Sequence, residues 1–327
     1  MRFGVIGVGS FGRKRAQAVI ESRGQLVAVA DTQESRATRV AAELGVLALP
    51  PPALLADPRI DAVIVCTPNR DHAAIGLQAV EQHKHVIIEK PLARSSAEAA
   101  PLASAARKAG VFVKTGANHR FFPSVQRARQ LLLEGAIGEV LHFNGRIGHD
   151  GERLAGSWSW DAAMSGGGSM LDNGCHLLDI ARWIMGPFVA VTGMRSNVYW
   201  RDCGVEDTAA AVYATAAGKM AVISASWRQL SGYLHFEVNG SDGYLTVDGR
   251  FDTHGGDRLY WQSRKAGSDI FALDFGHRPQ RSYVDELDAF IDAVAAGVTP
   301  EPTVEDGIEV LRMVEALYRA DGTRERV

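Results

Sequence analysis

Short apolar runs alternate with amphipathic stretches over the first third of the chain, a pattern typical of parallel strands joined by helices. The apolar runs begin at Phe3 to Ile6 and recur as QLVAVAD, DAVIVCTPN, KHVIIEKP and VFVKTG. Helical stretches around residues 71–82 and 95–109 separate the later runs. Because strands joined by right-handed helical crossovers build a doubly wound sheet, we predict an α/β domain with a parallel sheet over residues 1–118.

The pattern changes after residue 118. A helical stretch from about Pro123 to Glu134 is followed by strand-like segments such as EVLHFNGRIGH, KMAVISASW and YLHFEVNGS, and the NGSDG turn predicts a hairpin with GYLTVDG. Two helical segments end the chain. We expect a C-terminal α+β domain over residues 119–327 with a mostly antiparallel sheet. An open face of that sheet needs cover, which predicts a homodimer or homotetramer.

The first apolar run enters its helix through the motif GVGSFG, which predicts a dinucleotide-binding loop of the Rossmann type. Gly7 permits a tight turn, Gly9 lets the backbone approach a pyrophosphate, and Gly12 lets helix and strand pack closely. Ser10 and Phe11 complete the loop, where the helix N-terminus offers N–H groups to the phosphates.

Asp31 ends the second apolar run, about 20 residues after the last glycine, where a carboxylate binds the ribose hydroxyls. A carboxylate there repels a 2′-phosphate, and the following Thr32 and Gln33 carry no cation, whereas Arg36 lies further along and can soften the repulsion. The sequence therefore predicts NAD rather than NADP as the cofactor.

Two further loops follow predicted strands at their carboxyl ends, the edge at which doubly wound sheets bind ligands. Lys90 precedes a proline, so its backbone is biased away from helix; the residue alone leaves open whether it faces solvent or the cofactor. His72 is likewise either a cofactor neighbour or a solvated side chain at a helix start. The predicted cofactor-binding residues are Gly7, Gly9, Ser10, Phe11, Gly12, Asp31, Thr67, Pro68, Asn69, His72, Glu89 and Lys90.

The stretch GGGSMLDNGCHLLD places Asp172 and His176 four residues apart, hence on one face of a helix. Asp and His alone make a poor metal set, and Cys175 points elsewhere on a helix, so we expect no metal site. Two alternatives remain. Asp172 caps the helix and His176 is a packed histidine, or the pair performs acid–base work beside glycines that let the backbone approach a bound group.

Five motifs in order resemble the glucose–fructose oxidoreductase/inositol dehydrogenase family of NAD(P)-dependent enzymes: GVGSFG, CTPNRDH, EKP, NHRFFPS and GGGSMLDNGCHLLD. The match extends over nearly the whole chain. The resemblance implies a Rossmann domain followed by a domain whose open sheet often forms the oligomer interface. It also implies a catalytic group of Lys90, Asp172 and His176, and a Lys90–Pro91 peptide bond that is often cis.

Acid–base work suits the reaction that this family implies, the oxidation of a secondary alcohol of a sugar, sugar derivative or cyclitol. The nicotinamide accepts a hydride, and the proton needs a base near neutral pH. We assign His176 as base or acid, Lys90 as the donor that polarises the reacting oxygen, and Asp172 as the orienting carboxylate. Whether Lys90 or His176 takes the proton stays open. The predicted substrate-binding residues are Lys90, Asn118, Arg120, Trp160, Asp172 and His176.

Charge and composition exclude other classes of protein. A net charge of −3, from 35 basic and 38 acidic residues without a basic stripe, provides no field for nucleic acid or an anionic membrane. The three cysteines are widely spaced, and no run approaches a membrane span, so we expect a cytoplasmic protein. A dinucleotide-binding regulatory protein without turnover is the alternative function, although such a protein has no need of a proton-transfer group. Metal-assisted hydrolysis is a third possible function, but the sequence offers no suitable set of metal ligands for it.

Overall fold

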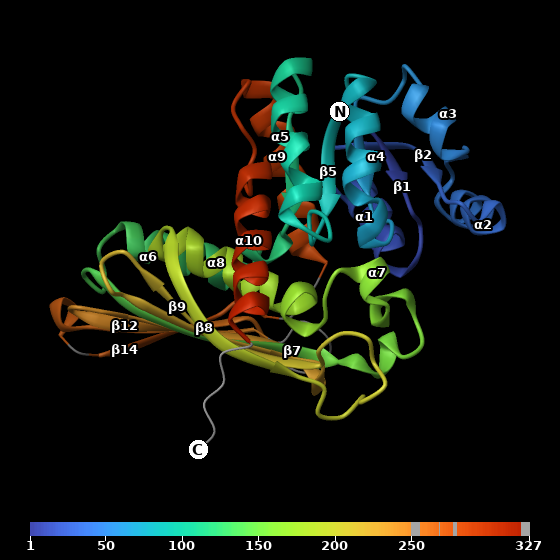
Figure 1. The fold of residues 1–327 in the computed structure, drawn as a ribbon. Coiled ribbons are helices and arrows are strands. Elements are labelled where there is room, and N and C mark those ends of the chain that lie inside the picture. The colour runs from blue at the N-terminus through green and yellow to red at the C-terminus, as the bar shows by residue number, and fades with distance from the viewer. Residues whose placement is uncertain (250–255, 268, 277–279, 322–327) are drawn as a thin grey trace. The chain divides into compact units, whose positions relative to one another are not determined.

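The computed structural model describes residues 1–249, 256–267, 269–276 and 280–321, which form two compact units (Figure 1). The first unit comprises Met1–Asn118 with Gln280–Leu311, and the second comprises His119–Pro279 with Arg312–Val327. Residues 280–311 were expected in the C-terminal domain, 119–327, but they cluster with the first unit. The reason is packing: Leu287 and Phe290 are buried in one core with Phe3 and Val5.

The first unit is built on a parallel sheet, as expected. Its strands occur in the order β3-β2-β1-β4-β5-β6, and each neighbouring pair is parallel. Most of these strands are buried along their length because helices cover both faces, which explains their continuous apolar runs. The strands are β1 (Arg2–Ile6), β2 (Gln25–Ala30), β3 (Leu47–Ala48), β4 (Ala62–Val65), β5 (His85–Glu89) and β6 (Val113–Gly116).

The helices of the first unit follow the expected alternation. The stretches predicted around residues 71–82 and 95–109 are α4 (Asn69–Glu81) and α5 (Ser96–Ala109). Ser95 caps α5 by accepting a hydrogen bond from the Glu98 N–H group. The other helices are α1 (Ser10–Glu21), α2 (Glu34–Leu44), α3 (Pro51–Ala56) and α9 (Arg281–Ala296), and α10 (Val304–Ala320) begins in this unit.

The second unit contains a mixed sheet that is mostly antiparallel. Within the described residues its strands occur in the order β14-β13-β12-β11-β7-β10-β9-β8, and β7 pairs with β10 in parallel. The predicted hairpin is confirmed as β11 and β12. The strands are β7 (Val140–Asp150), β8 (Phe188–Ser196), β9 (Thr208–Thr215), β10 (Met220–Ser226), β11 (Arg228–Gly240), β12 (Gly243–Gly249), β13 (Arg258–Ser263) and β14 (Ile270–Asp274).

Helices cover one face of this sheet. Figure 1 shows α6 (Pro123–Leu133) and α8 (Cys175–Met185) on the same side, and both touch its strands. In β9 and β10 every second residue is buried and points to the side that the helices cover. The residues between them point to the other side and are exposed or half-exposed, among them Ala210, Val212, Met220 and Val222. The sheet is therefore open on one face, as the strand pattern predicted.

Candidate active site

The glycine loop of the first unit has the geometry of a phosphate-binding turn. Gly7 has a left-handed φ of 85°, and a Cβ there would lie 2.7 Å from the Cys66 carbonyl oxygen. A Cβ on Gly12 would lie 1.7 Å from the carbonyl oxygen of Gly7, which accounts for the close packing of helix and strand. A Cβ on Gly9 would meet no atom within 4 Å, and Gly9 is the N-cap of α1 without a side-chain cap. The loop thus fits a pyrophosphate at Gly9.

Asp31 is tied to this loop. Its Oδ2 accepts a hydrogen bond from the Val8 N–H group at 3.0 Å, and its Oδ1 accepts one from Gln33 at 2.9 Å. The Arg36 guanidinium lies 3.2 Å from Oδ2 and is about one-third exposed. The carboxylate expected to meet the ribose is therefore partly neutralised by a cation of this chain.

The loops after β4 and β5 are joined by a buried histidine. The two ring nitrogens of His72 each lie 2.8 Å from a carbonyl oxygen, one of Thr67 and one of Pro91, and the residue is 1% exposed. A direct cofactor contact by His72 stays a prediction. Burial lowers the pKa of His72, and a neutral ring has one N–H group, so it donates to only one of these two carbonyl oxygens while lying against both loops. The Thr67 hydroxyl is buried and finds no hydrogen-bond partner among the described residues.

Lys90 belongs to the second of these loops. It is half-buried, and its peptide bond to Pro91 is cis, as the resemblance implied. Its N–H group donates to Glu89 Oε2 at 3.2 Å, so the carboxylate of Glu89 helps to fix the backbone of Lys90. Glu89 is itself buried and paired with Arg15. The Glu89 carboxylate is therefore engaged with Lys90 and Arg15 inside the protein rather than with solvent.

A buried network of charges continues from Glu89 into the first unit. Arg15, in α1, also pairs with Glu286 of α9, which pairs in turn with Lys114 of β6. Arg15, Lys114 and Glu286 are each fully buried. The network therefore links the helix that follows the glycine loop with the strand end that carries Lys90.

Asp172 of the second unit lies in a π-helical turn, Met170–Gly174, that leads into α8. Its Oδ2 accepts hydrogen bonds from His149 Nε2 and from Trp227 Nε1, both at 3.0 Å. The side chain is 30% exposed. Gly174 is the N-cap of α8 and no side chain caps it, so Asp172 does not cap that helix. Two fixed donors and partial exposure instead suit a carboxylate that orients a bound group.

The glycines before this turn have a structural cause. Gly166 ends the short helix α7 (Ala162–Ser165) with a left-handed φ of 84°. A Cβ on Gly167 would lie 2.3 Å from the Tyr318 hydroxyl, and one on Gly168 would lie 1.9 Å from the Glu206 carbonyl oxygen. The sequence suggested that these glycines admit a bound group. Gly167 and Gly168 instead make room for Tyr318 and Glu206.

His176 is the second candidate catalytic residue on this segment. It is 6% exposed and stacks on His119, with ring centroids 3.5 Å apart and planes inclined by 14°. Both residues belong to the second unit. The stack fixes the plane of the His176 imidazole.

Three residues expected to bind substrate have other contacts. Arg120 donates from Nε and Nη2 to Asp179 at 2.7 and 2.6 Å, lies over the Trp183 ring and is 2% exposed, which assigns it to supporting α8. Asn118 is buried and donates to Ser282. Trp160 packs with Trp200 in an apolar cluster. Because these side chains are engaged within the protein, the prediction that they touch substrate receives no support from their geometry.

Comparison with known proteins decides the family. Residues 1–117 match a model described as an oxidoreductase family with an NAD-binding Rossmann fold, and residues 125–246 match the GFO/IDH/MocA C-terminal domain. The chain is 31% identical to D-xylose 1-dehydrogenase (NADP(+)) 2 of Haloferax volcanii, over 99% of this chain and 98% of the relative. It is also 31% identical to myo-inositol 2-dehydrogenase of Thermotoga maritima, over 94% and 92%.

The chain belongs to the GFO/IDH/MocA family of oxidoreductases.

Solved structures agree with this family. An NAD-binding oxidoreductase from Klebsiella pneumoniae has the same fold, with a TM-score of 0.88 and 26% identity over 99% of this chain and 97% of that one. The resemblance inferred from the motifs is thus confirmed, and so are the Rossmann domain and the expectation of an NAD-binding enzyme.

Sequence reasoning missed two side chains of this GFO/IDH/MocA protein that hold Asp172. His149 lies near the end of β7, and Trp227 directly follows β10. These ends meet because the two strands pair in parallel, with Ser226 opposite Gly148. Polar or aromatic residues at strand ends were an available signal, but the sequence did not reveal that β7 and β10 are neighbours.

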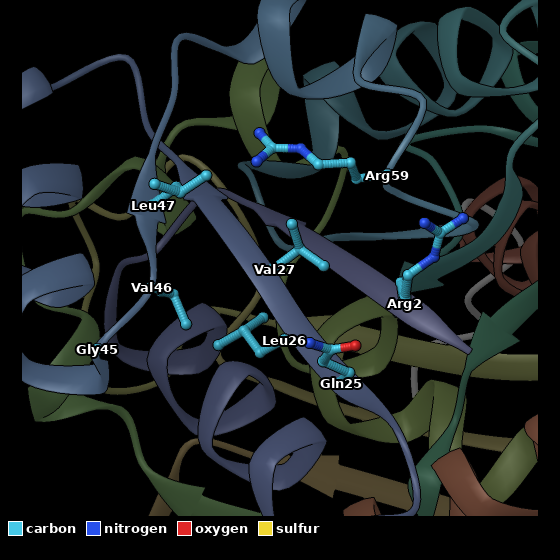
Figure 2. A pocket seen from close by; sticks show the side chains of 8 residues that line it. All are labelled: Arg2, Gln25, Leu26, Val27, Gly45, Val46, Leu47 and Arg59. Carbon is cyan, nitrogen blue, oxygen red and sulfur yellow. The ribbon is translucent and has the colours of Figure 1, made fainter.

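A pocket in the Rossmann unit lies away from the glycine loop. Figure 2 shows its lining side chains, which come largely from the amino ends of β1, β2 and β3, whereas the glycine loop follows the carboxyl end of β1. Its two arginines, Arg2 and Arg59, are paired with Asp61 and Asp57. The pocket is therefore distinct from the cofactor loop. Its lining is Arg2, Gln25, Leu26, Val27, Gly45, Val46, Leu47 and Arg59.

Among the residues that the structure describes, no group of three or more histidine, cysteine or acidic side chains is placed to hold a metal ion. None of the described helices combines the length and apolar character that a bilayer crossing requires.

Proposed function

We propose that this protein oxidises a secondary alcohol of a sugar, sugar derivative or cyclitol with NAD as hydride acceptor, or catalyses the reverse reduction. The observation that carries the proposal is the anchored carboxylate of Asp172, followed on the same segment by the stacked imidazole of His176. Relatives named for D-xylose, myo-inositol and scyllo-inositol support the substrate class.

Each residue of the proposed group has a separate task. Bound NAD supplies the hydride acceptor. An imidazole has the intrinsic pKa for proton transfer near neutral pH, so His176 takes the proton of the alcohol. The ammonium of Lys90 stabilises negative charge that develops on the reacting oxygen. The Asp172 carboxylate, held by His149 and Trp227, is assigned to orienting a substrate hydroxyl or the imidazole.

A regulatory protein that binds dinucleotide without turnover is the second candidate. The retention of Lys90, Asp172 and His176, with Asp172 fixed by two donors, favours an enzyme. Incubating the protein with NAD and a panel of pentoses, hexoses and cyclitols separates the two, because an enzyme accumulates reduced nicotinamide with at least one of them. Tight NAD binding without reduction by any member of the panel would favour the regulatory protein.

NAD is proposed as the preferred cofactor, with Arg36 limiting the preference. Asp31 repels a 2′-phosphate, whereas the Arg36 guanidinium 3.2 Å away offsets part of its charge. We expect wild-type kcat/KM to favour NAD over NADP. Arg36→Ala should widen that ratio by roughly two- to fivefold, the range for a partly exposed ion pair.

Arg39 provides the control for this prediction, because it is an exposed arginine of the same helix, α2. Arg39→Ala should leave the NAD/NADP ratio unchanged. Equal or better efficiency of the wild type with NADP would contradict the cofactor assignment, and an unchanged ratio in Arg36→Ala would contradict the role of Arg36.

A second copy of the chain is proposed to cover the open sheet face of the second unit. Val212 and Val222 lie opposite each other on this face, and Met220 is 48% exposed beside them. We expect light scattering to give a dimer or tetramer of the 35.2 kDa chain. Val222→Lys should lower that mass, since a cation would be buried without a partner.

Leu133 is the matched control, because it is 71% exposed on α6 and does not belong to the sheet. Leu133→Lys should leave the mass unchanged. A wild-type protein that scatters as a 35 kDa species at micromolar concentration would refute the assembly.

We also propose a cytoplasmic location, in keeping with the sequence. Cys66, Cys175 and Cys203 form no disulfide in the structure, and two of them are buried. Unmodified thiols persist most readily in a reducing compartment.

A further inference from the structure

We propose that Glu206 is a positioning residue for Asp172, acting through the turn Met170–Gly174 and through Trp227. The inference rests on the proposed function, because it concerns the same site. Glu206 acts on Asp172 indirectly. Its effect is carried by the backbone that leads into the turn and by Asp207, the residue that follows Glu206 in the chain.

Glu206 holds the start of this segment by three successive backbone N–H groups. Its carboxylate accepts hydrogen bonds from Gly168 and Met170, each at 3.0 Å, and its own carbonyl oxygen accepts one from Ser169 at 2.8 Å. The N–H groups at the start of a helical segment have no partner within the helix. Glu206 therefore provides the partners that the turn itself lacks.

The fit between these segments leaves little room for adjustment. A Cβ on Gly168 would lie 1.9 Å from the Glu206 carbonyl oxygen, so the two backbones are in direct contact. The Gly168 carbonyl oxygen in turn accepts a hydrogen bond from the Asp172 N–H group at 2.8 Å. A displacement of Glu206 is consequently passed to the backbone of Asp172.

The next residue, Asp207, holds the other support of Asp172. Its carbonyl oxygen accepts a hydrogen bond from the Trp227 N–H group at 2.8 Å, and the Trp227 indole donates to Asp172 Oδ2. Trp227 is fully buried, so its ring follows its backbone. Residues 206 and 207 thus fix both the backbone under Asp172 and one of the two donors to its carboxylate.

Glu206 lies deep in the second unit and has one further donor. It is 3% exposed, and the hydroxyl of Tyr318 donates to its Oε1 at 2.7 Å. Burial raises the pKa of the Glu206 carboxyl, and the hydrogen bonds from Tyr318, Met170 and Gly168 oppose that rise. Tyr318 therefore helps to retain the acceptor that the turn needs.

Glu206→Gln is the sharpest test, because it keeps the shape of the side chain while one acceptor oxygen becomes an NH₂ group that faces a donor. We expect kcat for the sugar or cyclitol to fall by about 10- to 100-fold, the scale of a displacement near 1 Å at a reacting centre. The KM for NAD should stay unchanged, since the glycine loop is in the first unit.

The indole N–H resonance of Trp227 provides a readout that is independent of activity. It is measured by NMR on protein labelled at tryptophan, and the Trp227→Phe variant identifies the signal. The resonance should shift in Glu206→Gln and should shift by less in Tyr318→Phe. Tyr318→Phe keeps the carboxylate and replaces Glu206→Gln as the test if that variant does not fold. Asp257→Asn is the matched control. Asp257 is a half-buried carboxylate of the same unit that accepts hydrogen bonds from Ser124 at the start of α6. This variant should change neither kcat nor the Trp227 resonance.

Wild-type kcat together with an unshifted Trp227 resonance in both Glu206→Gln and Tyr318→Phe would overturn the proposal. A loss of kcat with an unshifted resonance would overturn it as well, because the effect would then not pass through this turn. Failure of the proposed function has a different signature. The wild-type protein would then reduce no NAD with any sugar or cyclitol, while the resonance would still report whether Glu206 positions Trp227.

Discussion

Replacing His176 with alanine is expected to lower kcat by roughly 10²- to 10⁴-fold while NAD binding stays intact. The imidazole that accepts the proton is lost, but the glycine loop and Asp31 belong to the other unit. Lys90→Ala should cause a loss of similar size, because developing charge on the oxygen would lose its cation. Steady-state kinetics with the best sugar or cyclitol, together with NAD titration by protein fluorescence, provide the two readouts.

A residue outside the site serves as the control for these variants. Lys108 is an exposed lysine of α5. Lys108→Ala should retain wild-type kcat. Near-normal turnover in both His176→Ala and Lys90→Ala would place the chemistry elsewhere in the protein.

Glu286→Ala should destabilise the first unit by about 3–5 kcal/mol, the cost of leaving buried charge without a partner. The carboxylate pairs with Arg15 and Lys114, and all three side chains are fully buried. Its removal leaves two cations facing each other away from water. Glu305→Ala is the matched control, because Glu305 pairs with Arg107 at the surface, where a pair contributes about 1 kcal/mol or less.

The same cluster predicts a pH dependence. Burial alone would raise the pKa of Glu286, but Arg15 and Lys114 outweigh burial and hold that pKa below its ordinary value. Because the folded-state pKa is lowered, the stabilisation is present above the unfolded pKa of about 4.3 and is lost as pH falls through the folded value. Urea unfolding at pH 7 and at about pH 3 should show a smaller fall in stability for Glu286→Ala than for wild type. Equal unfolding free energies of Glu286→Ala and Glu305→Ala at pH 7 would rule out this account.

The Rossmann half of the site was largely predictable from the sequence, because its determinants are local. Gly7, Gly12 and Asp31 lie within one strand–turn–helix–strand unit, and their spacing predicts the tight turn and the close packing of helix and strand that the structure has. The ribose contact of Asp31 stays a prediction. The surroundings of His72 were not predictable, for the opposite reason. Its ring nitrogens each lie 2.8 Å from a carbonyl oxygen, on two loops that no local pattern brings together.

The second half of the site depends on contacts between distant residues. The spacing of Asp172 and His176 predicted one helical face, but Asp172 lies in a π-helical turn and His176 in the α-helix that follows it. Of the glycines before this turn, Gly167 makes room for Tyr318, and Gly168 makes room for Glu206, which lies 38 residues further along the chain. The return of α9 to the first unit is fixed by an even longer pairing, between Arg15 and Glu286, 271 residues apart. Sequence periodicity reports local structure and therefore cannot show such pairs.

Direct hydride transfer from a carbon–hydrogen bond to NAD is the central claim of this account. Its most direct measurement uses sugars and cyclitols that carry deuterium on carbon, among them D-xylose and myo-inositol, with mass spectrometry of the nicotinamide ring after incubation with NAD. Deuterium should appear in the reduced nicotinamide with the wild-type protein and not with a Lys90→Ala/His176→Ala double variant. Reduced nicotinamide that contains no deuterium, or an equal yield from the double variant, would contradict the claim.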